Sequence, residues 1–273
     1  MTAQPSRSGN AESTTPTATG TAKNSRVTAV LDRFWPQTGQ RWTPFGERPR
    51  SWWPDILLAL AVVAVTSLLV WRSPLVMLDI GLRDWALETR PEWAFIVADI
   101  ARYVGQGTPL TIIVLGLAIV SARRYHTVRP IVLHVAAWLS VNIVIGLFKE
   151  WADRVAPRFP DTNGPPPYVE ADGSLLFSGL DHMSFPSGHA ANTAVWYGLI
   201  VMLIGVNMTS QWRRILLVAP PIILILAQTY TTFHWISDVI VGLLVGFLIV
   251  RQLQRIPWES IRLGPLARFD TGP

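Results

Sequence analysis

Long uncharged stretches alternate with short charged segments over most of this chain. Six apolar stretches stand out, and each is bounded by residues that carry charge or favour turns. The pattern predicts six transmembrane helices, at about residues 56–71, 109–122, 130–148, 188–206, 215–231 and 235–250. The expected fold class is therefore all-α, a polytopic membrane protein with a six-helix transmembrane core.

Two parts of the chain do not fit this alternation. Residues 78–102 mix apolar with acidic and basic side chains, which favours amphipathic helices at the membrane surface, separated near Pro91. Residues 1–50 are rich in Ser, Thr, Pro and Gly and have no apolar periodicity. We therefore divide the chain into a disordered tail (1–50), a transmembrane domain (51–252) and a C-terminal tail (253–273).

The composition agrees with a membrane protein and excludes several other classes. Half of the residues are hydrophobic and 15% are charged, against roughly 25% charged in soluble domains. The chain has no cysteine, which excludes a disulfide scaffold and a cysteine-ligated zinc site. The net charge of +5 comes from scattered arginines rather than a basic stripe, so no nucleic-acid partner is expected.

The arginines also predict an orientation. They concentrate in the loops at 123–129 and 213–214 and in the segment after residue 250. Because cytoplasmic loops carry an excess of Lys and Arg, both termini are expected in the cytoplasm. The segments 72–107, 149–187 and 231–235 then lie on the opposite side of the plasma (inner) membrane.

Polar residues of the types that serve in catalysis and binding lie at the ends of three of the apolar stretches. In the predicted topology all three ends lie on the extracytoplasmic face, although they are far apart in sequence. The three clusters are Lys149; Ser187, Gly188 and His189; and His234 with Asp238.

Each cluster has a chemical use. A helix that starts at Ser187 and Gly188 offers free backbone N–H groups, which bind anions. Asp238 follows His234 by one helical turn, so its carboxylate can hold one ring nitrogen protonated and leave the other as nucleophile or base. Lys149 adds a cation. Together they predict a site that binds a tetrahedral oxyanion and attacks it with imidazole.

Structural interpretations exist for each cluster taken alone. A single Ser-Gly-His is a weak signal, His234 with Asp238 can simply cap a helix, and a lysine at the end of a span is typical of an interfacial anchor. Ionisable groups inside spans are costly, however, and indicate function by default. We interpret His134 and His182 as structural.

With these motifs, the sequence from about residue 52 to 252 resembles the type 2 phosphatidic acid phosphatases (PAP2 family), which share a helical core with vanadium haloperoxidases. The family pattern is Lys, six residues, Arg-Pro; then Pro-Ser-Gly-His; then Ser-Arg, five residues, His, three residues, Asp. The resemblance implies His234 as a nucleophile that forms a phosphohistidine, Asp238 as its orienter and His189 as general acid. It implies Lys149, Ser187 and Gly188 as the phosphate cradle.

The chain departs from the family pattern at both arginines that bind phosphate. Ala156 stands where the first motif has Arg, and Ala227-Gln228 stand where the third has Ser-Arg. We expect Arg154 or Arg158 to take over the first position and Gln228 to donate a neutral hydrogen bond at the other. Without such replacement, the loss of two charged hydrogen bonds would slow phosphoryl transfer by several powers of ten.

Three hypotheses follow. The favoured one is a lipid phosphatase or phosphotransferase that acts on a lipid phosphate or prenyl diphosphate at the outer leaflet, with the bilayer and the lipid as its partners. The second is another transfer reaction on a less charged lipid or glycan substrate. The third is a non-catalytic relative that binds a lipid headgroup. No metal or cofactor is expected, and the loop 149–187 is expected to shape substrate choice.

Overall fold

The computed structural model describes residues 42–158, 175–177 and 182–271. Within these ranges the chain is helical, and its one β-bridge joins Arg154 to Met183. The predicted all-α class is confirmed. Most of the predicted N-terminal tail and the middle of the predicted loop 149–187 lie outside the described residues.

Five of the described helices are long and apolar enough to cross a membrane. A sixth apolar helix, α2 (Trp53–Leu68), has 16 residues; at 1.5 Å per residue it is about 24 Å long, somewhat less than a bilayer core. All six predicted apolar helices are therefore present, with bounds shifted by a few residues. The five longer ones are α5 (Gly107–Tyr125), α6 (Arg129–Ala152), α7 (Gly188–Ile204), α8 (Ser210–Tyr230) and α9 (Ile236–Arg255).

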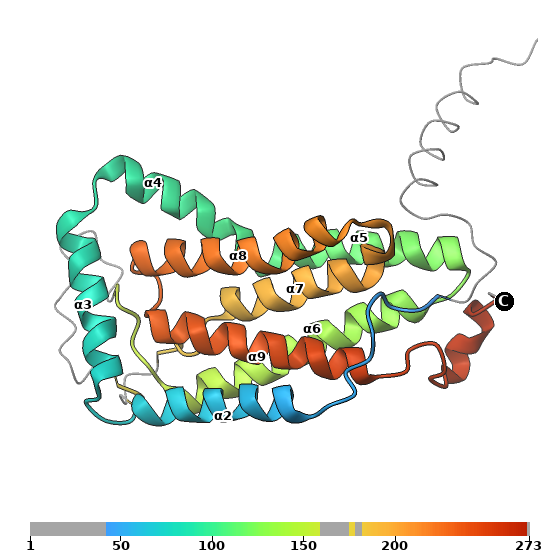
Figure 1. Ribbon diagram of the computed structural model, residues 1–273, viewed down its shortest axis with the longest axis horizontal. Helices are drawn as coiled ribbons and strands as arrows, with labels where there is room; N and C mark the ends of the chain where they lie inside the picture. The colour runs from blue at the N-terminus through green and yellow to red at the C-terminus, as the bar shows by residue number, and fades with distance from the viewer. Residues whose placement is uncertain (1–41, 159–174, 178–181, 272–273) are drawn as a thin grey trace, which may run out of the picture. The chain divides into compact units, whose positions relative to one another are not determined.

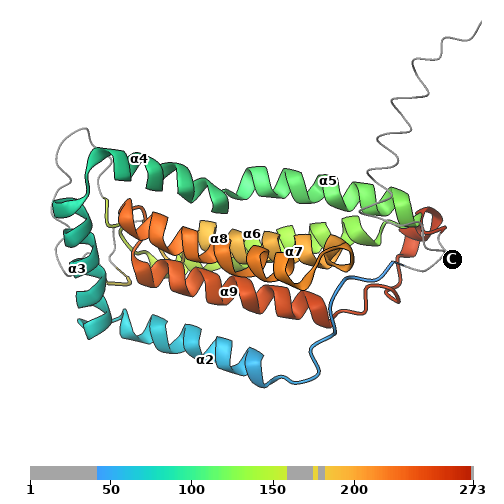
Figure 2. The same ribbon diagram turned by 45° about the horizontal axis from the view of Figure 1, so that its top comes forward.

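The charged segment forms α3 (Pro74–Thr89) and α4 (Glu92–Ala101), and Pro91 separates them as predicted. Both helices lie at the end of the bundle where α9 begins (Figures 1 and 2). The short helix η1 (Arg102–Gly105) then leads into α5. Because α5 and α6 run in opposite directions, as do α8 and α9, the end of α6 and the starts of α5, α7 and α9 meet at this end. We call it the site end.

Helix α7 is the centre of the packing, with neighbours α5, α6, α8 and α9. Its closest approach is to α9, at Gly242 and Gly246. A Cβ added at Gly242 would collide with the carbonyl oxygen of Ser187, and one at Gly246 would lie 2.7 Å from the Cβ of Ala194. The backbone N–H of Ser187 donates to the carbonyl of Asp238 at 3.0 Å. These glycines therefore let the start of α7 pack directly against the start of α9.

Packed structure extends beyond the predicted transmembrane domain on both sides. Before α2, Trp42 is buried and the N–H of Phe45 donates to the carbonyl of Met202. After α9, Trp258 is buried, and Asp270 pairs with Arg129 at 2.8 Å just beyond the short helix η4 (Gly264–Phe269). The described parts of both predicted tails thus contact the bundle, at the end opposite to the site end.

Candidate active site

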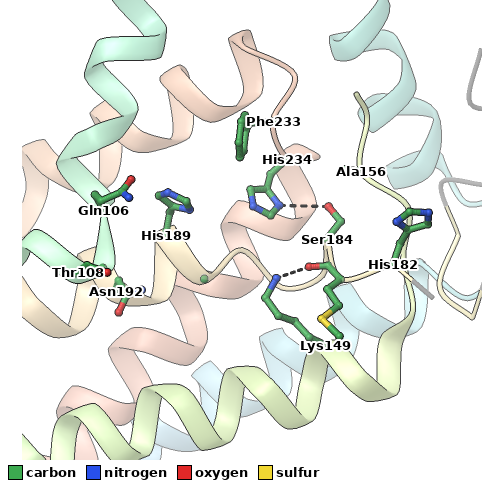
Figure 3. Close-up of a pocket in the computed structure, with 13 residues that line it drawn as sticks. Gln106, Thr108, Lys149, Ala156, His182, Ser184, His189, Asn192, Phe233 and His234 are labelled. Atoms are coloured by element: carbon green, nitrogen blue, oxygen red, sulfur yellow. Dashed lines mark hydrogen bonds between the residues drawn. The ribbon is translucent and has the colours of Figure 1, made fainter. Parts of the chain in front are cut away.

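A pocket of about 550 Å³ opens at the site end. It brings the three predicted clusters together, because Lys149, Gly188, His189 and His234 all line it (Figure 3). Its wall is formed by the end of α6, the starts of α5 and α7, the turn before α9, and two loop segments. The other lining residues are Gln106, Gly107, Thr108, Ala156, His182, Met183, Ser184, Asn192 and Phe233.

One ring nitrogen of His234, Nδ1, contacts polar groups on the side away from the pocket. This nitrogen lies 3.4 Å from Oδ2 of Asp238 and 3.3 Å from the hydroxyl of Ser184. The same carboxylate oxygen accepts from Ser184 Oγ at 2.6 Å and from the backbone N–H of Trp235 at 3.2 Å. Nδ1 thus faces the protein, while the rest of the ring lines the pocket. This is the arrangement that leaves Nε2 available as a nucleophile.

His189 lies across the pocket from His234, with 6.5 Å between the ring centroids. Reacting atoms approach to about 3–3.5 Å before bond formation, so a group between the rings would be within reach of both. The Phe233 ring lies beside both histidines, 6.3 Å from His189 and 6.1 Å from His234. The guanidinium of Arg102 is 4.4 Å from the Phe233 ring centre, and its charge also acts on His189.

The predicted cradle residues divide into two groups. Gly188 and Lys149 line the pocket, and Lys149 Nζ donates to the carbonyl of Met183. Ser187 lies behind them: it is fully buried, and its hydroxyl donates to Oε1 of Gln228 at 2.8 Å while it accepts from the N–H of Ala190 at 3.3 Å. Ser187 is therefore the N-cap of α7, and Gln228 fixes its hydroxyl.

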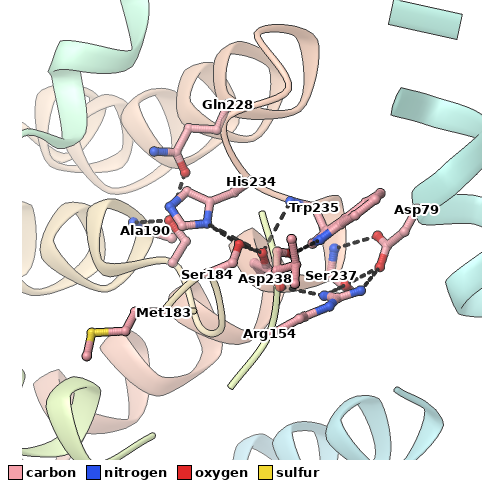
Figure 4. A network of polar contacts seen from close by, with 12 residues as sticks. Asp79, Arg154, Met183, Ser184, Ala190, Gln228, His234, Trp235, Ser237 and Asp238 are labelled. Atoms are coloured by element: carbon pink, nitrogen blue, oxygen red, sulfur yellow. Dashed lines mark hydrogen bonds and ion pairs between the residues drawn. The ribbon is translucent and has the colours of Figure 1, made fainter. Parts of the chain in front are cut away.

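Arg154 and Arg158 are both placed away from the pocket wall. Arg154 is fully buried behind the histidine, where it pairs with Asp238 at 2.5 Å and with Asp79 at 2.6 Å (Figure 4). Arg158 is exposed, with its guanidinium 5.8 Å from the ring of Phe95 on α4. The described pocket lining thus contains Ala156 at the family's arginine position and neither neighbouring arginine.

Several residues of this site do not stand out in the sequence. Ser184 lies in a loop, and Gln106 and Asn192 are ordinary polar residues near helix starts. Asp79 and Ser237 belong to a buried network around Arg154. One feature of the sequence could have indicated that Asp79 is buried. It lies at helical spacing from other α3 residues that are buried, namely Val76, Arg83 and Ala86.

Burial raises the pKa of Asp79, although Arg154 and the hydroxyl of Ser237 oppose that effect. His182 lines the pocket, while its backbone N–H donates to the side chain of Asp153. His134 is remote from the pocket lining and stacks on Trp196 at 5.2 Å. Among the described residues, no three His, Cys, Asp or Glu side chains form a group that could hold a metal ion.

Comparison with known proteins agrees with this geometry. The family model of the PAP2 superfamily matches residues 130–262, which contain every residue of the three motifs. A search of curated proteins found no match. Among solved structures, the chain is similar to that described as the first transmembrane PAP2 type phosphatidylglycerolphosphate phosphatase from Bacillus subtilis, with 17% identity and a TM-score of 0.60. The match covers 77% of this chain and 99% of the other. Residues 130–262, which carry the site, thus belong to the PAP2 superfamily.

Proposed function

We propose that this protein is an integral membrane phosphatase or phosphotransferase that acts on a lipid phosphate or a prenyl diphosphate. His234 is the nucleophile, Asp238 holds its Nδ1–H, and His189 is the general acid. Lys149 and the N-terminal amides of α7 at Gly188 hold the phosphoryl oxygens, with Ser187 and Gln228 fixing the start of that helix. The observation that carries the proposal is the pair of histidines across one pocket, with one of them bound to a buried carboxylate.

In the first step, Nε2 of His234 attacks phosphorus and the bond from phosphorus to the ester oxygen breaks. His189 gives its proton to that oxygen, so the lipid leaves as an alcohol, or as a phosphate if the substrate is a diphosphate. The imidazole becomes positively charged as the N–P bond forms, and the carboxylate of Asp238 stabilises this charge. Lys149 and the helix N-terminus offset the charge of the phosphoryl oxygens.

In the second step, water or another hydroxyl compound attacks the phosphohistidine. His189, now neutral, takes the proton of the attacking oxygen, and the N–P bond breaks to restore His234. Attack by water releases inorganic phosphate, whereas attack by an alcohol gives a new phosphate ester. Both outcomes use the same residues.

The proposed location of the site is the extracytoplasmic face of the plasma membrane. The arginine-rich loops lie at the opposite end of the bundle, which the positive-inside rule assigns to the cytoplasm. The pocket then lies near the headgroups of the outer leaflet. The Bacillus subtilis relative is described as acting on a phospholipid phosphate, which supports a lipid substrate here too.

The proposal is tested with the purified protein in detergent. Lipid phosphates, prenyl phosphates and prenyl diphosphates are supplied, and release of phosphate is measured for the wild type and for His234→Asn. The control is His126→Asn, the same substitution at the opposite end of α5, where His126 adopts a left-handed conformation that asparagine tolerates. We expect release by the wild type and His126→Asn only. A folded wild type that releases phosphate from none of these substrates overturns the proposal.

One observation favours a second candidate, a transfer reaction on a substrate with a single negative charge. Among the described residues that line the pocket, Lys149 is the one lysine or arginine, and the remaining polar groups include the neutral donors Gln106, Thr108 and Asn192. A phosphodiester would need less positive charge than a phosphomonoester. Adding phosphodiester lipids to the same panel separates the two: turnover of diesters alone would favour this second candidate.

A further inference from the structure

A buried ionic network lies directly behind the proposed nucleophile. It joins Asp79 of α3, Arg154 after α6, and Ser237 and Asp238 in the first turn of α9 (Figure 4). All four residues are at most 1% exposed. Asp79 and Arg154 are 75 residues apart in the sequence, but a terminal guanidinium nitrogen of Arg154 lies 2.6 Å from Oδ2 of Asp79.

Arg154 uses its planar guanidinium to hold two carboxylates at once. One terminal nitrogen donates to Oδ1 of Asp238 at 2.5 Å and to the hydroxyl of Ser237 at 2.7 Å. The other donates to Oδ2 of Asp79 at 2.6 Å. Asp79 in turn accepts from the backbone N–H of Ser237 at 3.1 Å and from its hydroxyl at 2.5 Å. The position of the guanidinium is thus fixed by Asp79 and by the start of α9.

The two oxygens of Asp238 therefore have separate partners. Oδ1 is held by Arg154, while Oδ2 accepts from Ser184 and Trp235 and faces Nδ1 of His234. Rotation of this carboxylate would break the bond to Arg154. The arginine thus fixes which oxygen the histidine meets.

The charges of the network suit a histidine that becomes positive during the reaction. With both carboxylates ionised, Asp79, Asp238 and Arg154 carry a net charge of −1. Asp79 offsets part of the positive charge of Arg154. Arg154 therefore weakens the attraction between Asp238 and a positively charged His234 less than it would in an exclusive ion pair with Asp238. The neighbouring Arg83, whose guanidinium is 5.5 Å from the Trp235 ring centre, is paired with Asp84 at 2.8 Å.

We propose that Asp79 and Arg154 are positioning residues for the nucleophile, holding Asp238 so that its Oδ2 orients His234. This inference rests on the proposed function of His234. Arg154 lies two residues before Ala156, the position at which the family has arginine. In this proposal Arg154 acts through the carboxylate that orients the nucleophile and does not bind the phosphate. Neither residue touches the substrate.

The decisive variant is Asp79→Asn, with Asp84→Asn as a matched control on the same helix. Asparagine keeps the size of the side chain and removes its charge, so Arg154 would pair with Asp238 alone. We expect kcat to fall about 10–100-fold, as it does when groups that orient the ligands of a metal ion are lost, while KM changes less than twofold. Asp84→Asn should keep the wild-type kcat. A purely structural role would lower the yield of folded protein but leave kcat per folded molecule unchanged.

A second measurement does not depend on turnover. The ring nitrogens of ¹⁵N-histidine-labelled protein are observed by NMR in detergent, and the His234 signals are identified by their loss in His234→Asn. Asp79→Asn should shift the Nδ1 signal of His234, whereas Asp84→Asn should not. If the wild type hydrolyses nothing, the proposed function fails while this measurement still tests the network. Wild-type signals and wild-type kcat in Asp79→Asn would overturn the inference.

Ser237→Ala tests the same network without changing any charge, in case Asp79→Asn does not fold. It removes a hydroxyl that bridges Arg154 and Asp79. We expect the same direction of change in kcat and in the His234 signal, with a smaller size than for Asp79→Asn, because the ion pairs of Arg154 with Asp79 and Asp238 remain. If Ser237→Ala leaves both quantities at their wild-type values, the inference is wrong.

Discussion

The two ends of α9 carry ionic clusters of opposite composition. At the site end, one arginine, Arg154, lies between two carboxylates, and all three side chains are 0% exposed. At the opposite end, one carboxylate, Asp55 of α2, lies between Arg251 and Arg255, whose side chains are 26% and 13% exposed. Each cluster ties α9 to a helix outside the α7 core, α3 at one end and α2 at the other.

The difference separates a chemical role from a packing role. The cluster at the site end, with two carboxylates to one arginine, faces a histidine that lines a pocket. The excess positive charge at the opposite end faces backbone: Arg255 donates to the carbonyls of Pro49 and Ser51, just before α2. We infer that the first cluster acts on the reaction and the second holds the segment before α2 against the bundle. The following predictions test this contrast.

The largest of these effects is expected for His189→Asn at the site end. Loss of a general acid typically slows a reaction 10²–10⁴-fold, and we expect kcat to fall within this range. The loss should be smaller for a substrate whose leaving group is a good one without protonation, such as para-nitrophenyl phosphate. Equal losses for an alkyl and a nitrophenyl phosphate would contradict the role of His189 as acid.

Lys149→Ala should have the next largest effect. A hydrogen bond to a charged group contributes about 1.5–3 kcal/mol, so kcat/KM should fall about 10–100-fold. Competitive inhibition by inorganic vanadate, a phosphate analogue, should weaken by a similar factor. If vanadate binds Lys149→Ala as tightly as the wild type, this lysine does not hold the phosphoryl oxygens.

Arg102→Ala tests whether a cation outside the family motifs assists the site. Arg102 lies over Phe233 and its charge acts on His189. Interactions between partly exposed charges contribute at most about 1 kcal/mol, so kcat/KM should fall by up to about fivefold. Arg158→Ala is the matched control, since this exposed arginine lies over Phe95, and its kcat/KM should stay within twofold of the wild type. The reverse ranking would restore Arg158 as the replacement for the missing arginine.

Asp55→Asn should have the smallest effect on activity and a clear effect on stability. The buried carboxylate bridges two arginines that are partly exposed. Loss of its charge should therefore lower the free energy of unfolding by about 1–3 kcal/mol, between the values for exposed and buried pairs. Thermal unfolding in detergent should shift to lower temperature while kcat stays within twofold. A fall in kcat as large as that expected for Asp79→Asn would remove the contrast between the two ends.

Much of the fold follows from local sequence, because a helix in lipid must satisfy its own backbone hydrogen bonds and expose apolar side chains. The same reasoning places Lys149, His189 and His234 at one end, since successive spans reverse direction. The positions of Arg154 and Ser184 do not follow from local sequence. Arg154 turns inward because Asp79, 75 residues earlier, offers it a second carboxylate, and no local pattern around residue 154 records that pairing. Ser184 acquires its partners only because its loop pairs with the segment after α6.

The most direct test of the account is to trap the covalent intermediate. The enzyme is mixed with a lipid phosphate that carries ³²P, quenched within milliseconds under alkaline conditions that preserve phosphohistidine, and digested. We expect label on the peptide that contains His234, its disappearance on further incubation, and no label in His234→Asn. Turnover without label on that peptide, or label on a different residue, would contradict it.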